Sequence, residues 1–180
     1  MGRTGRALTL RGTYKLDDGA IGEMTNILDY IGPDRTRAWR IVGAWIWPKD
    51  IQAETGSSNE TCAVGAMLST DFFKVVQFNT CMDAGDNRQC GWMYKQYQRR
   101  ADGTDYIVPN ATSIPESCGF LIDFDTLVVK ELYLTMFVRS EGSTNPSRTW
   151  NYLIALEERK VTPWESLFQQ IKGIGQDQDS

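Results

Sequence analysis

Strand-like alternation in the last third of the chain is the feature that most constrains the fold. The run Leu127–Val138 alternates with a period of two, and one of its faces is nearly all apolar. In a second run, Thr149–Val161, one face carries Trp150, Tyr152, Ile154 and Leu156. The polar stretch Ser140–Ser147, which holds a glycine and a proline, separates the two runs. The pattern therefore predicts an antiparallel hairpin with a long loop.

A short helix is predicted directly after the second run. Thr162 and Glu165 have the spacing of a capping box, in which each side chain accepts the backbone N–H of the other residue. Pro163 suits the first helical position, and Gly173 favours a stop. We expect the helix over residues 162–173 and a polar tail over 174–180. The apolar face of this helix is formed by Leu167, Phe168 and Ile171.

Shorter strand-like runs separated by turn signals fill the rest of the chain. They are Arg6–Leu16, Ala38–Trp47, Cys62–Leu68, Phe72–Phe78, Gly91–Gln98, Tyr106–Val108 and Phe120–Phe124. With the two C-terminal runs they indicate an all-β protein of about eight to ten short strands, either an antiparallel β-sandwich or a small barrel. The length of 180 residues fits a single domain, with residues 1–6 as an N-terminal arm.

Charge and hydropathy argue against two classes of partner. The formal net charge of −4 repels nucleic acid, and Arg3, Arg6 and Arg11 are too few to form a strong basic arm. No apolar run approaches the roughly 20 residues that a membrane helix needs. Residues 1–6 lack the apolar core of a signal peptide. We therefore expect no strong nucleic-acid binding, no membrane insertion and no signal peptide.

The sequence offers little catalytic chemistry. It contains no histidine, which removes the commonest general base and the commonest metal ligand. Four irregularly spaced cysteines favour buried thiols over a zinc site, with a Cys81–Cys90 disulfide as the alternative. Asp83–Asn87 predicts a turn, and Asp123 with Asp125 would share one face of a strand, as a glycan hydrolase requires. The expectation is a protein that is not an enzyme and has no cofactor and no metal, and a histidine-free glycan hydrolase built on Asp123 and Asp125 is the alternative.

Tryptophans supply the candidate contact residues. Trp39, Trp45 and Trp47 would line one face of a single strand, and Trp92 would lie with Tyr94 on another. Such rows form part of a core, the centre of a subunit interface, or a platform on which sugars stack. A carbohydrate-binding sandwich therefore stays open as an alternative, with a glycan receptor as its partner.

A Trp-rich strand, Arg37–Pro48, precedes further short strands, and the run Asn151–Glu157 then leads into a capped C-terminal helix. In this order of elements the chain resembles small virion structural proteins of environmental viruses, in which a single jelly roll is typical. The resemblance implies a capsid, spike or tail component that assembles in the host cytoplasm with copies of itself and other virion proteins. Under this interpretation Trp164, Leu167 and Phe168 of the helix join the tryptophans as interface candidates.

Overall fold

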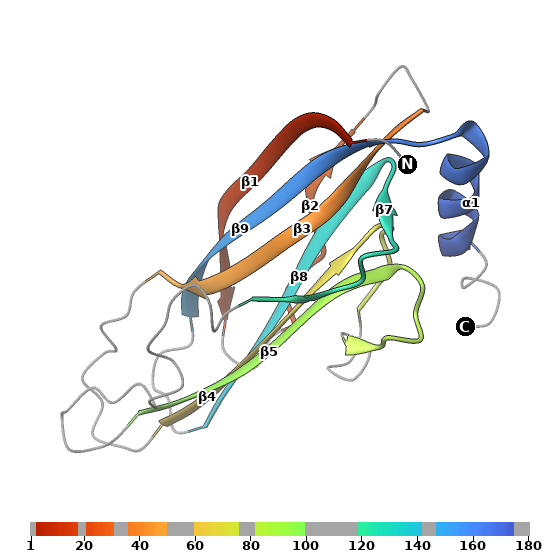
Figure 1. The fold of residues 1–180 in the computed structure, drawn as a ribbon. Helices are drawn as coiled ribbons and strands as arrows, with labels where there is room; N and C mark the ends of the chain where they lie inside the picture. The colour runs from red at the N-terminus through yellow and green to blue at the C-terminus, as the bar shows by residue number, and fades with distance from the viewer. Residues whose placement is uncertain are drawn as a thin grey trace.

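The computed structural model describes residues 3–17, 21–30, 36–49, 60–75, 82–99, 119–141 and 147–174. In this part of the chain nine strands form two sheets, and one helix follows the last strand (Figure 1). The elements are β1 (Arg3–Asp17), β2 (Thr25–Asp29), β3 (Arg37–Pro48), β4 (Glu60–Ser69), β5 (Gln89–Arg99), β6 (Leu121–Ile122), β7 (Leu127–Val128), β8 (Glu131–Glu141), β9 (Ser147–Lys160) and α1 (Pro163–Ile174).

The order of the strands in the two sheets is that of a jelly roll. The first sheet has the order β1-β9-β3-β7, and the second has the order β2-β8-β4-β5-β6. The two late strands are inserted between early ones, since β9 lies between β1 and β3 while β8 lies between β2 and β4. All neighbouring strands pair antiparallel. The expected antiparallel β-sandwich with a jelly-roll-like order and a short C-terminal helix is confirmed.

The predicted C-terminal hairpin is wrong. The run Leu127–Val138 is split into β7, which pairs with β3 in the first sheet, and β8, which pairs with β2 and β4 in the second. β9 returns to the first sheet, between β1 and β3. The physical reason is that alternation shows which face of a strand is buried and does not show the sheet to which the strand belongs. Two strands that are adjacent in sequence can bury their apolar faces against each other from opposite layers.

The core lies between the two sheets and follows the predicted alternation. β8 contributes Leu132, Leu134, Met136 and Val138, all of them buried. β9 contributes Trp150, Ile154 and Leu156 from the opposite sheet. Burial of these apolar faces from both layers is the main stabilising contribution in a sandwich of this kind.

A bulge in β3 divides the tryptophans that the sequence places on one face. The pairing of β3 with β9 shifts register between Ile41 and Gly43, and Val42 between them is 48% exposed. Before the bulge Trp39 faces the core, and after it Ala44 and Ile46 face the core. Trp45 and Trp47 therefore point to the outer face of the first sheet, where both are half-buried. The expectation of a single three-tryptophan face is wrong because one extra residue inverts the alternation.

Several element boundaries differ from the expected ones. β1 begins at Arg3, inside the expected N-terminal arm, and β6 keeps only two residues of the expected run Phe120–Phe124. Residues 72–75 have no regular structure, and Tyr106–Val108 lies outside the described residues. α1 ends at Ile174, one residue beyond the expected stop. No helix in the described ranges is long and apolar enough to cross a membrane.

Candidate functional site

The N-terminus of α1 carries the predicted capping box. Thr162 Oγ1 accepts the backbone N–H of Glu165 at 3.2 Å, and Glu165 Oε2 accepts the backbone N–H of Thr162 at 2.7 Å. The Thr162 hydroxyl also donates to Glu165 Oε2 at 3.0 Å. These hydrogen bonds favour the ionised carboxylate and lower the pKa of Glu165 below its ordinary value. The start of the helix is therefore fixed locally, by its own residues.

The apolar face of α1 points away from the sandwich. Ser166 lies against the protein body and is 3% exposed, and Gln169 Nε2 donates to the backbone oxygen of Asp125 at 3.4 Å. On the opposite side of the helix, the exposed fractions are 80% for Trp164, 41% for Leu167, 64% for Phe168 and 51% for Ile171. Figure 1 shows the helix standing beside the two sheets without covering either of them. We call these four side chains the helix face.

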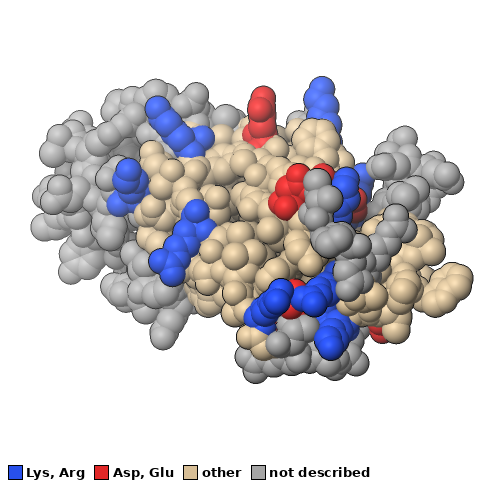
Figure 2. All heavy atoms as spheres, turned by 90° about the horizontal axis from the view of Figure 1, so that it is seen from above, with Lys and Arg blue, Asp and Glu red and all other residues tan. Residues whose placement is uncertain are grey.

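Several ion pairs lie near the end of β9, just before α1 begins. Glu158 is 2% exposed, and its carboxylate accepts a hydrogen bond from Arg37 at 3.1 Å. The same carboxylate forms a longer ion pair with Arg6, at 3.9 Å. Next to it Arg159 pairs with Glu157 at 2.8 Å. Figure 2 shows the molecule from above, and on this face basic side chains outnumber acidic ones, which lie towards the centre and right of the view. Because Glu158 is buried, removing its partners would leave a charge without compensation, which is strongly destabilising.

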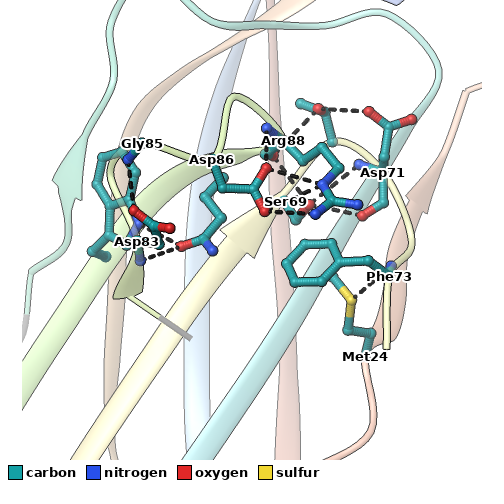
Figure 3. A network of polar contacts seen from close by, with 11 residues as sticks. Met24, Ser69, Asp71, Phe73, Asp83, Gly85, Asp86 and Arg88 are labelled. Atoms are coloured by element: carbon teal, nitrogen blue, oxygen red, sulfur yellow. Dashed lines mark hydrogen bonds and ion pairs between the residues drawn. The ribbon is translucent and has the colours of Figure 1, made fainter. Parts of the chain in front are cut away.

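A second candidate site is the polar turn between β4 and β5. The carboxylate of Asp86 accepts hydrogen bonds from Arg88 Nε at 2.9 Å and from Arg88 Nη2 at 2.8 Å, a bidentate pair (Figure 3). The guanidinium group of Arg88 lies over the ring of Phe73, 4.3 Å from its centroid. The carbonyl oxygen of Arg88 accepts the hydroxyl of Ser69 at 3.0 Å. The turn is thereby tied to the end of β4 and to the segment that follows it.

Gln89 connects this turn to Trp92. Its side chain is nearly inaccessible, and its Oε1 accepts the backbone N–H of Asp83 at 3.0 Å and the indole Nε1–H of Trp92 at 2.8 Å. Asp83 Oδ1 in turn accepts the backbone N–H of Gly85 at 2.8 Å, as Figure 3 shows. The predicted turn over Asp83–Asn87 is confirmed, and the side chain of Gln89, which accepts the backbone N–H of Asp83 in this turn, also accepts the indole N–H of Trp92.

Trp92 borders a pocket of about 330 Å³ between this turn and β6. The pocket is lined by Ala84, Asp86, Asn87, Gln89, Trp92, Leu121, Ile122, Asp123 and Thr126. Asp123 Oδ1 accepts the backbone N–H of Asp125 at 3.0 Å, and Asp123 Oδ2 accepts the hydroxyl of Thr126 at 2.5 Å. Asp123 and Asp125 therefore lie in the turn after β6 and not on one face of a strand as expected, because β6 ends at Ile122. The hydrogen bonds of the Asp123 carboxylate close this turn.

The structure separates the sequence-derived site residues into four places. Trp39 is in the core, edge-on to Tyr30 with ring centroids 5.9 Å apart. Trp45 and Trp47 lie on the outer face of the first sheet, Trp92 borders the pocket, and the helix face holds the last group, which comprises Trp164, Leu167 and Phe168. Sequence reasoning missed Gln89 and identified Asn87 only as part of a turn, because the turn signal at Asp83–Asn87 was the one mark of this region. Cys90 is buried and free, so the alternative of a Cys81–Cys90 disulfide is not supported.

Comparisons with known proteins return a distant structural likeness. No protein-family model and no curated protein sequence matches this chain. Among solved structures, the chain is similar to VP1 of the Trichodysplasia spinulosa-associated polyomavirus, determined in complex with GM1 oligosaccharide. The TM-score is 0.35 and the sequence identity is 9%, over 84% of this chain and 78% of that one.

Proposed function

We propose that this chain is a one-domain structural subunit of a virus particle and that it associates with copies of itself through the helix face. The observation that carries the proposal is the exposure of Trp164 and Phe168 on a helix that begins at a well-formed cap. The jelly-roll strand order supports it, because viral capsid domains are among the proteins built on this fold. The fold alone does not decide function, so the proposal depends on the surface.

The helix face has the spacing of a docking surface. Its four side chains follow positions i, i+3, i+4 and i+7 of α1, which form one continuous stripe. Amphipathic helices commonly bind by laying such a stripe into an apolar groove of a partner. A large exposed apolar patch on a soluble chain marks an interaction surface.

The size of the stripe indicates how strong one contact would be. A whole aromatic side chain has about 150–250 Å² of surface. Because Trp164 and Phe168 are largely exposed, a contact that covered both completely would bury roughly 300 Å² of their accessible surface. A stable two-body interface buries about 800 Å² on each partner. A single contact through α1 would therefore be weak, and stable association would require several contacts per copy, as a closed symmetric shell provides.

In this proposal the partners are further copies of the chain and other virion proteins, and the chain resides in the assembled virion as a capsid, spike or tail component. A β-sandwich with an accessory helix suits such a role because the sandwich folds on its own core while the helix remains available.

The test compares the full chain with two matched variants, Phe168→Glu on the helix face and Gln170→Glu beside it, each of which adds one negative charge to α1. We expect the wild type and Gln170→Glu to form oligomers in light scattering and particles in electron micrographs. Phe168→Glu should remain monomeric with an unchanged circular dichroism spectrum. A wild type that is monomeric at high concentration, or a Phe168→Glu variant that assembles as the wild type does, would contradict the proposal.

A further inference from the structure

We propose that the pocket beside Trp92 binds a neutral polyhydroxyl ligand, such as the terminal neutral sugar of a glycan. This is a binding role separate from self-association, and it involves different residues. The inference starts from the composition of the pocket wall, which combines apolar side chains with hydroxyl-binding groups.

The two sides of the pocket match the two sides of a sugar. Trp92, Leu121 and Ile122 offer apolar surface, against which the C–H face of a sugar ring can pack. Asp123, Asn87 and Thr126 offer oxygen and nitrogen atoms to hydroxyl groups. The volume of about 330 Å³ lies at the small end of the range for small-molecule sites, roughly 300–1,000 Å³. A terminal sugar unit is a ligand of the appropriate size.

The key aromatic side chain is held in place before any ligand arrives. The hydrogen bond from Trp92 Nε1 to Gln89 fixes the indole, and Gln89 is itself fixed by the backbone N–H of Asp83. Gln89 is 2% exposed, so these hydrogen bonds lie outside competition from bulk water. A pre-organised ring loses little conformational entropy when a ligand packs against it, which favours binding.

The charges of the pocket select against anionic ligands. Two carboxylates line it, those of Asp86 and Asp123, and among the described lining residues none is Lys or Arg. Arg88 compensates Asp86 through the bidentate pair. Each oxygen of Asp123 accepts one hydrogen bond within the turn and keeps further lone pairs for hydroxyl donors. Hydroxyl groups of a neutral sugar are therefore favoured, and the carboxylate of a sialylated sugar would be repelled.

The test uses the full chain and three neutral disaccharides, lactose, maltose and cellobiose, with sialyllactose as the anionic comparator. Binding is followed by the NMR resonance of the Trp92 indole N–H and by saturation transfer to the sugar. We expect at least one neutral disaccharide to shift that resonance in a saturable way, at millimolar concentration, and sialyllactose to bind more weakly. Repeating the titration on Phe168→Glu separates this site from assembly, since the affinity should be unchanged there.

Three variants locate the binding. Trp92→Ala should weaken the neutral sugar about tenfold, by the loss of a stacking surface. Leu121→Ser changes a lining side chain that is 72% exposed, so it should fold normally and weaken binding severalfold. Tyr94→Ser is the matched control. Tyr94 lies on the same face of β5 as Trp92 and is 58% exposed, but it does not line the pocket. The proposal fails if no neutral disaccharide shifts the Trp92 resonance, if sialyllactose binds best, or if Tyr94→Ser weakens binding as much as Leu121→Ser.

Discussion

Gly65 provides a sharp test of how the second sheet is packed. It lies in β4 directly opposite Phe137 of β8, and a Cβ atom at Gly65 would overlap Cζ and both Cε atoms of the Phe137 ring. The ring is 7% exposed and also contacts Tyr94, with centroids 6.4 Å apart, so it has little room to move. Positive φ is not found at Gly65, so the effect of a side chain there is steric. Gly65→Ala should therefore cost about 1–3 kcal/mol through overpacking, reduced by roughly 0.5–1 kcal/mol because alanine suits a strand better than glycine.

The control is Phe137→Leu, which removes Cζ and both Cε atoms and leaves a side chain that ends at Cδ. In that background Gly65→Ala should be neutral or stabilising by up to about 0.5–1 kcal/mol, so the effect of the same substitution changes sign. Urea unfolding of the four proteins, followed by tryptophan fluorescence and by circular dichroism, gives each free energy from midpoint and slope. A destabilisation by Gly65→Ala of the same size in both backgrounds would refute the steric reasoning, as would a stabilising effect in the wild type.

Three further predictions concern the cap and the buried thiol. Thr162→Ala should cost about 1 kcal/mol of helix stability, seen as faster amide hydrogen exchange within α1 and an unchanged rate in β8. The lowered pKa of Glu165 means that its contribution to the cap is present above the ordinary value of 4.5 and is lost as the pH falls through the lower folded-state value, so the amide resonances of α1 should report fraying only in acid. Burial, together with the nearby charges of Asp123 and Asp71, raises the pKa of the Cys90 thiol, so a thiol reagent at mildly alkaline pH should leave native Cys90 unmodified and react with it in urea; reaction at the same rate in both states would contradict its burial.

Local patterns predicted the elements of this fold better than their arrangement. The alternation of Leu132, Leu134 and Met136 identified the core-facing side of β8, and the capping box together with Gly173 located α1 to within one residue at each end. Both signals depend only on residues that are close together in the sequence, which is why the sequence alone predicts these two elements. The sheet to which β8 and β9 belong depends on contacts between strands far apart in sequence, and a single sequence carries no direct sign of those pairings.

The candidate sites were predictable to different degrees. The apolar stripe of α1 was predictable, but the sequence left open whether the sandwich itself would cover Phe168, and only the structure shows that side chain exposed. The pocket was not predictable, because it brings together the turn before β5 and the turn after β6, more than thirty residues apart. The division of the tryptophans was missed for a different reason: the only sign of the bulge at Val42 is the neighbouring Gly43, and a glycine inside a strand indicates either a bulge or a close approach of another group.

The exposed helix face also bears on how α1 itself is stabilised. An isolated helix of twelve residues is marginal in water, and helices in proteins gain most of their stability by burying an apolar face. In the described part of the chain, α1 has its cap, the buried Ser166 and the contact from Gln169 to Asp125, while its apolar face stays in water. Covering that face would therefore add stability to the helix and to the assembly in one step. Amide protection in α1 should then rise on assembly by a larger factor than protection in the sandwich, whose core is already complete in the single subunit.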